Sequence, residues 1–274
     1  MESTLPTTLY PTSDQPDTNC LNCNEKLTGK YCFNCGQKAD TQRFRMSSLW
    51  SQRFWDETFQ LNRGLLRTLV QLYYRPGRIA AEYIGGHRKR YFNFVSLLLL
   101  LVASAIVVYK QIDHSAFIKI NENLNSPQLR KIVNPTSFFK IFIEYYQLLV
   151  FFVLPPLGWA VWLLFRRMQL TYLEGVVAAA FLLSAQFVVE LVLNSLSVLL
   201  PPTSRFVIGQ MLVVVTYVIQ PFVFGWQFSK GYYKTWGKLW RCVGLIIAVG
   251  LITSVIISFV IGFVDGYRLA GIGG

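Results

Sequence analysis

The chain has 274 residues, of which 53% are hydrophobic and 15% are charged, and its mean hydropathy is +0.39. This balance is too apolar for an ordinary soluble domain and too regularly patterned for a disordered chain, so it predicts an integral membrane protein. The formal net charge of +12 would suggest nucleic acid as the partner of a soluble protein. Here most Lys and Arg precede residue 91 or lie in two short loops, which is typical of membrane topology.

Four segments follow one another along the chain. Residues 1–19 are rich in Thr, Pro and Asp, without a basic start or an apolar run, so they predict a disordered tail and not a cleavable signal peptide. Residues 20–37 form a cysteine motif, residues 38–90 a basic juxtamembrane segment, and residues 91–274 a transmembrane helical bundle. The predicted fold class is therefore all-α, with a small ribbon ahead of the membrane.

The cysteine motif consists of two C-x-x-C knuckles separated by eight residues. Four thiolates at this spacing can close a tetrahedral zinc site with no vacant position for a catalytic water. The interpretation is a structural zinc ribbon, with a redox or disulfide pair and another metal as open alternatives. Free thiols require a reducing compartment, so a zinc site favours a cytoplasmic N-terminus. The predicted metal ligands are Cys20, Cys23, Cys32 and Cys35.

Nucleic acid is an unlikely partner for this ribbon. Its only basic residues, Lys26 and Lys30, are offset by Glu25, which is a poor footprint for phosphates. A protein-contact role is the better prediction.

The segment Met46–Gln71 carries Trp, Phe and Leu at intervals of three and four residues among arginines. It predicts an amphipathic helix, broken near Gly64, that lies on anionic lipid headgroups. The core of a small soluble domain is the alternative.

A basic block follows, from Tyr74 to Tyr91. Arg78 and Glu82 are an i,i+4 pair on a short predicted helix that starts near Pro76. The basic side chains of this block are predicted to contact lipid headgroups or a partner; they are Arg75, Arg78, Arg88, Lys89 and Arg90.

The order of these motifs resembles an uncharacterised family of bacterial multi-span membrane proteins with an N-terminal zinc ribbon, catalogued as a domain of unknown function. The resemblance covers about the first 110 residues and implies a bacterial inner-membrane protein, but no activity. It rests on C-x-x-C, C-x-x-C-G-Q and R-P-G-x-x-x-x-E-Y-I-x-G-x-R-x-R-Y, that is on Cys20, Cys23, Cys32, Cys35, Gly36, Gln37, Arg75, Pro76, Gly77, Tyr83, Gly86, Arg88, Arg90 and Tyr91. The overall layout is also similar to that of Yip1-type membrane-trafficking proteins.

Five apolar segments are long enough to cross a bilayer. The segments between these spans lie alternately on the two sides of the membrane. The side that holds the N-terminus carries 19 of the 26 Lys and Arg, which predicts a cytoplasmic N-terminus and an outside C-terminus. Pro155-Pro156 predicts a kink or break in the second span, with a re-entrant segment as the alternative. Glu174, near a span end, is expected to reach lipid headgroups. The predicted spans are Tyr91–Tyr109, Ile141–Phe165, Val176–Leu200, Phe206–Phe228 and Cys242–Val264.

Gln186, Glu190 and Asn194 form a polar stripe at i, i+4 and i+8 on the third span. An ionisable group at this depth should face the bundle interior. The stripe is either an interhelical hydrogen-bond lock or part of a proton- or cation-coupled pathway.

On the fifth span, one face carries only small residues at every fourth position. Such a face packs closely on another helix, within the chain or across a homodimer. The residues are Gly250, Ser254, Ser258 and Gly262.

These features favour a non-enzymatic membrane scaffold or trafficking-type protein that recruits a cytosolic partner or organises lipid. A small transporter or channel that uses the stripe around Glu190 is the alternative. No nucleophile-elbow, P-loop or H-E-x-x-H motif argues for an enzyme.

Overall fold

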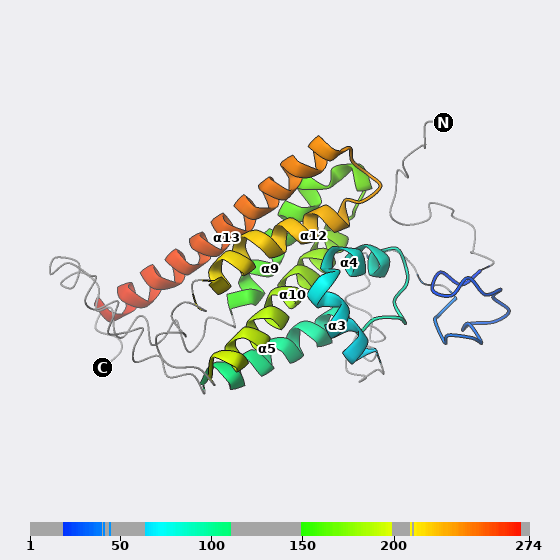
Figure 1. The fold of residues 1–274 in the computed structure, drawn as a ribbon, viewed down its shortest axis with the longest axis horizontal. Helices are drawn as coiled ribbons and strands as arrows, with labels where there is room; N and C mark the ends of the chain where they lie inside the picture. The colour runs from blue at the N-terminus through cyan, green and yellow to red at the C-terminus, as the bar shows by residue number, and fades with distance from the viewer. Residues whose placement is uncertain are drawn as a thin grey trace.

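The computed structural model describes residues 19–39, 41, 44, 64–110, 149–198, 209 and 211–269, and these residues are mostly helical (Figure 1). No β-strand occurs among them; the ribbon holds only the isolated bridges Asn19–Lys26 and Tyr31–Lys38. The helices are α3 (Leu65–Tyr74), α4 (Pro76–Ile84), α5 (Phe94–Lys110), α9 (Val150–Leu164), α10 (Tyr172–Val198), α12 (Gln220–Phe228) and α13 (Thr235–Leu269), with a 3-10 turn at Arg166–Met168 and a π-helical turn at Val215–Ile219.

Three of these helical stretches are long and apolar enough to cross a membrane: Tyr172–Leu196, Met211–Phe228 and Thr235–Val260. This makes the structure compatible with a membrane protein. α5 and α9 are apolar but shorter, and residues 141–148, which belong to the second predicted span, lie outside the described residues. Five spans and their orientation therefore stay predictions.

The long helices run alternately away from the ribbon end of the molecule and back towards it (Figure 1). Contacts at that end join two short basic loops, between α9 and α10 and between α12 and α13. The distribution of Lys and Arg predicts both loops on the same side of the membrane. The backbone N–H of Arg167 donates to the hydroxyl of Tyr233 at 3.1 Å, and the Arg241 guanidinium lies 3.8 Å from the centre of the Tyr233 ring. The structure thus places both loops at the same end of the bundle as the ribbon (Figure 1).

α9 continues without a break through Pro155 and Pro156. The two missing N–H donors therefore do not end the helix: of the predicted kink or break, the break is not found, and the kink and the re-entrant alternative stay predictions. The hydroxyl of Tyr172 donates to the Pro155 carbonyl at 3.2 Å, which ties α9 to the start of α10.

α10 is the central helix of the bundle, and residues 177–182 in its first half are completely buried. It packs on α9 so closely that a side chain on Gly158 would overlap the backbone of Val176. Because α9, α5 and α4 all surround α10, its position fixes theirs.

A capping box starts α10, and this corrects the prediction for Glu174. The Glu174 carboxylate accepts the backbone N–H of Thr171 at 2.8 Å, and the Thr171 hydroxyl accepts the backbone N–H of Glu174 at 3.2 Å. The side chain is completely buried, so it does not reach lipid headgroups as predicted.

The small-residue face of α13 packs on no other described helix. Ser254, Ser258 and Gly262 are exposed, and nothing lies within 4 Å of a Cβ built on Gly250 or Gly262. Packing of this face within the described part of the chain is therefore not found, and its use in a homodimer stays a prediction.

Candidate metal centre and its docking on the bundle

The two knuckles of the ribbon have the same backbone geometry. In the first, the N–H of Asn24 donates to the carbonyl of Cys20 at 2.8 Å; in the second, the N–H of Gly36 donates to the carbonyl of Cys32 at 2.9 Å. Asn24 and Gly36 both adopt positive φ angles, of 61° and 69°, which glycine and asparagine tolerate best. Gly36, directly after the last cysteine, therefore occupies a position that favours glycine.

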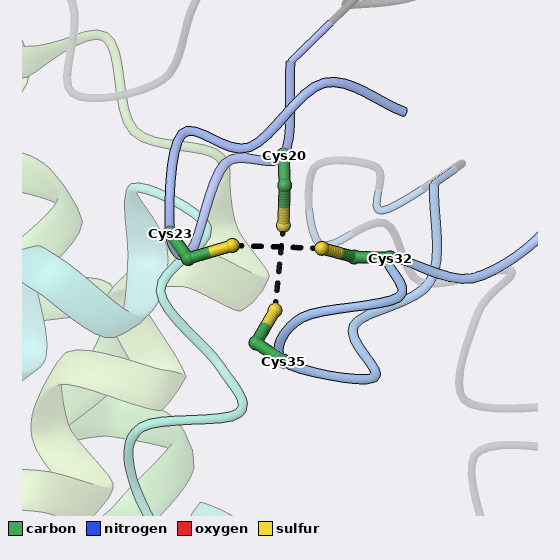
Figure 2. A group of neighbouring side chains, drawn as sticks. All are labelled: Cys20, Cys23, Cys32 and Cys35. Carbon is green, nitrogen blue, oxygen red and sulfur yellow. Dashed lines mark hydrogen bonds between the residues drawn. The ribbon is translucent and has the colours of Figure 1, made fainter. Parts of the chain in front are cut away.

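These turns direct all four sulfurs to one point, as Figure 2 shows. The Sγ atoms of Cys20 and Cys35, and those of Cys23 and Cys32, are 3.5 Å apart, and all four lie within 4.8 Å of one another. Ligands about 2.3 Å from a tetrahedral zinc ion would be about 3.8 Å apart, which is close to this spacing. The cluster could therefore hold a metal ion, and no other such cluster occurs in the described ranges.

The environment of the cluster shifts the pKa values of two of these thiols in opposite directions. The backbone N–H of Cys35 stabilises the Cys32 thiolate and lowers the pKa of Cys32 to about 7. For Cys23, the backbone N–H of Glu25 lowers the pKa, but burial and the neighbouring sulfurs outweigh it and raise the pKa to about 12. Repulsion among the sulfurs opposes ionisation of all four thiols, and a bound divalent metal would offset part of the negative charge of the thiolates.

Gln37, directly after the second knuckle, joins the ribbon to the basic block. Its side-chain Nε2 donates to the carbonyl of Gly86 at 2.8 Å, and its Oε1 accepts the backbone N–H of Lys89 at 3.3 Å. Leu21 of the first knuckle packs on Gly86, where φ is +105° and a Cβ would lie 2.9 Å from the Leu21 side chain. Glycine is therefore needed at position 86 for both conformation and space.

A second glutamine, Gln227 on α12, holds the other end of the same block. Its Nε2 donates to the carbonyl of Tyr74 at 3.0 Å, and its Oε1 accepts the backbone N–H of Gly77 at 3.2 Å. Gly77 lies so close to α12 that a Cβ there would come within 2.2 Å of the Phe224 carbonyl oxygen. The R-P-G motif thus serves a close helix contact, a role that local sequence patterns did not reveal.

Glu82 is the centre of a charge network within the block. Its carboxylate pairs with Arg78 at 2.8 Å, as predicted, and also with Arg90 at 3.3 Å, and it accepts a hydrogen bond from the Tyr91 hydroxyl. Burial opposes the charge on Glu82, but these donors outweigh it and hold its pKa below the ordinary value.

The five basic residues predicted to contact lipid or a partner occupy different environments. Arg78 and Arg90 belong to the Glu82 network. Arg88 is half-buried, with its guanidinium 3.8 Å from the centre of the Phe44 ring. Arg75 and Lys89 have exposed side chains, and the Arg75 guanidinium lies over the Tyr74 ring.

Phe44 anchors the chain between the ribbon and the bundle. Its ring stacks on Tyr83 of α4 and meets Phe94 of α5 edge-on, and its carbonyl accepts the hydroxyl of Thr171 at 2.9 Å. Phe44 was missed by sequence reasoning, because a lone aromatic residue in a basic segment does not reveal its distant partners.

A polar cleft of about 620 Å³ lies along the seam between the first knuckle and the basic block. His87 and Arg90 of the basic block line it together with residues of the first knuckle, and these include Cys20 and Cys23, so the cleft borders the metal centre.

α3 is the described part of the predicted amphipathic helix, and it begins after Gly64, where a break was predicted. Leu66, Val70 and Tyr73 project from one face and are 76%, 60% and 62% exposed. The residues before Gly64, from position 46, lie outside the described residues.

The three residues of the polar stripe on α10 have different surroundings. Gln186 is buried, and its Nε2 donates to the carbonyl of Thr216 at 2.7 Å. Glu190 is half-buried and lines a small cavity, whereas Asn194 lies outside that cavity.

Comparison with known families places residues 62–106 against the model of a protein of unknown function (DUF3667). The matched part runs from just before α3 to near the end of α5, so it contains the basic block but not the cysteines. No curated protein matches the chain, and no solved structure matches it. The similarity to the layout of Yip1-type proteins accordingly rests on predicted topology alone.

Proposed function

We propose that the protein is a non-enzymatic membrane scaffold in which a zinc ribbon, fixed to the cytoplasmic end of a five-span bundle, recruits a cytosolic protein. The observation that carries this proposal is the way in which the ribbon is docked. Leu21 and Gln37 face the bundle, whereas Tyr31 and Phe33 on the second knuckle are 62% and 73% exposed. A surface that is both rigidly held and aromatic is typical of protein recognition.

The expected partner presents apolar side chains next to acidic ones. Lys30 is exposed beside Tyr31, and Lys26 is exposed on the connection between the knuckles. An acidic rim on the partner would complement these charges and speed association.

The lipid part of the proposal rests on α3. Its exposed face combines Leu66, Val70 and Tyr73 with the exposed side chains of Arg67 and Arg75. Apolar residues bordered by arginine suit a helix that lies at the headgroup layer of an anionic membrane. In the bacterial inner membrane that the motif resemblance implies, this face would hold the ribbon at a constant height above the lipid.

Recruitment is tested by purifying the intact protein in mild detergent and quantifying bound proteins by mass spectrometry. The variant Tyr31→Ala/Phe33→Ala should lose a specific cytosolic protein and keep its metal. Trp236→Ala, which removes an equally exposed aromatic residue on α13, is the matched control for recruitment and should keep that protein. An unchanged set of bound proteins in the ribbon variant would remove the basis of the proposal.

A further inference from the structure

A small cavity of about 90 Å³ lies among α9, α10, the π-helical turn and α13. Glu190 lies 18 residues beyond the start of α10, a rise of about 27 Å, so the cavity is in the half of the bundle away from the ribbon. It has room for a few water molecules or a bare cation. Its polar lining comes from Gln186, Glu190, Thr216, Tyr217 and Thr253, and the rest of its wall is apolar.

The π-helical turn explains how the polar groups reach this position. A turn widened from i+4 to i+5 bonding displaces backbone carbonyls from their usual partners, and such turns are frequent at functional sites. Thr216 and Tyr217 both belong to this turn, and the Thr216 carbonyl is satisfied by Gln186 from α10. The Thr216 hydroxyl in turn donates to the carbonyl of Leu212 at 2.7 Å. The polar wall is therefore held by hydrogen bonds on two helices.

The atoms that could coordinate a ligand in this cavity indicate which kind of ligand it binds. Each polar side chain in the lining offers oxygen: a carboxylate, two hydroxyls, a phenol and an amide carbonyl. Among the described residues that line the cavity, none is Lys, Arg or His, and the titratable ones are Glu190 and Tyr217; the described residues contributed by α9 and α13 carry no titratable group. Oxygen ligands with one negative charge suit a small hard cation of charge +1 and would leave a divalent ion uncompensated.

An ionised carboxylate at membrane depth costs about 2.5 to 3.5 kcal/mol on insertion scales, and a bound proton or cation offsets its charge. We propose that this cavity is a monovalent-cation site, in which Glu190 binds a proton or a sodium ion and Gln186, Thr216, Tyr217 and Thr253 supply neutral oxygen ligands. This site lies far from the ribbon, and its occupancy is independent of the scaffold function proposed above.

The test uses the full-length protein in detergent micelles, with sodium as the probe and choline as the bulky control cation. Equilibrium binding of radioactive sodium measures the sodium form. The infrared carbonyl stretch of a neutral carboxyl group, followed over the pH range in which the protein stays folded, measures the proton form.

Saturable sodium binding that Glu190→Gln abolishes would identify sodium as the ligand. A titrating carboxyl band that Glu190→Gln removes, without sodium binding, would identify the proton. Ser184→Ala is the matched control, because Ser184 is a buried polar residue of α10 outside the cavity lining. It should leave both signals unchanged.

Thr253→Val keeps the carboxylate and so serves as a second test if Glu190→Gln does not fold. It should weaken sodium binding by about tenfold, or shift the midpoint of the infrared titration, because one oxygen ligand is lost. Absence of both sodium binding and a titrating carboxyl band in the native protein would overturn the proposal and leave the polar stripe as a hydrogen-bond lock.

Discussion

The side-chain amide of Gln37, in the ribbon, binds the backbone of Gly86, in the helical bundle. The amide donates to the Gly86 carbonyl and accepts the N–H of Lys89, and the Gln37 side chain is only 3% exposed. Both backbone groups belong to the turn that leads from α4 towards α5. The ribbon is therefore attached to the bundle at the segment that leads into α5.

Replacing Gln37 by leucine should release the ribbon without unfolding it. The change leaves the Gly86 carbonyl and the Lys89 N–H without their partner, which costs about 1–3 kcal/mol for each group that stays buried. Hydrogen exchange should rise at residues 86–89, while the metal content of the protein stays constant. Equal exchange in both proteins would show that Leu21 alone holds the contact.

Gly77→Ala should disrupt the packing of α4 on α12. The new Cβ would meet the carbonyl oxygen of Phe224 and the backbone nitrogen of Phe228, neither of which can rotate away. We expect a loss of about 1–3 kcal/mol of stability, seen as a lower midpoint of thermal unfolding in detergent. Gly29→Ala is the control, because nothing lies within 4 Å of a Cβ at that position. Equal unfolding midpoints for the two variants would count against the close α4–α12 contact.

The Glu82 network should make stability depend on pH in the acid range. Since the pKa of Glu82 in the folded protein is below its ordinary value of 4.5, the stabilisation is fully present above 4.5 and is lost as pH falls through the lowered value. Glu82→Gln should cost about 1 kcal/mol or less at neutral pH, because the network is partly exposed. Unfolding curves of the two proteins should converge on acidification.

Glu25→Gln, a change of a carboxylate outside this network, is the control for the pH experiment. It should not alter the acid dependence. A difference between native protein and Glu82→Gln that persists at low pH would point to packing and not to charge.

The features that could be predicted from the sequence are those that depend on residues close together along the chain. The knuckles follow from the C-x-x-C spacing, and the Arg78–Glu82 pair follows from the repeat of a helix. Gln37–Gly86 and Gln227–Gly77 span 49 and 150 residues, and no local pattern indicates which backbone groups a glutamine will meet. They depend on how the bundle packs.

Glu174 shows a different kind of error, since its signal was present in the sequence. Thr171 precedes it by three residues, in the order expected of a capping box at a helix start. A charge near the end of an apolar segment predicts a contact with lipid headgroups, but in the structure the local hydrogen bonds of the capping box prevail. The π-helical turn at Thr216 gave no comparable signal, because its residues would equally suit an α-helix.

Metal analysis should find about one zinc ion per purified chain, as four cysteine ligands with tetrahedral spacing predict. Cys32→Ser should lose the metal and expose the ribbon to proteolysis, since structural zinc contributes directly to folding. Cys242→Ser, which changes the buried cysteine of α13, is the control and should keep it. A metal-free protein with two disulfides, isolated under thiol trapping, would contradict both the zinc site and a reducing environment.

The alternating course of the helices predicts where reporters will be active. A reporter fused after Gly274 should work only outside the cytoplasm, and one inserted at Arg167 should work only inside. The physical reason is that Arg167 and Arg241 meet around Tyr233 at the ribbon end, so their charges must be on one side of the bilayer. α13 carries the chain away from that end (Figure 1). Cytoplasmic activity at Gly274 would require an even number of crossings, and the short helix α9 would then be the first candidate for a segment that enters the membrane without crossing it.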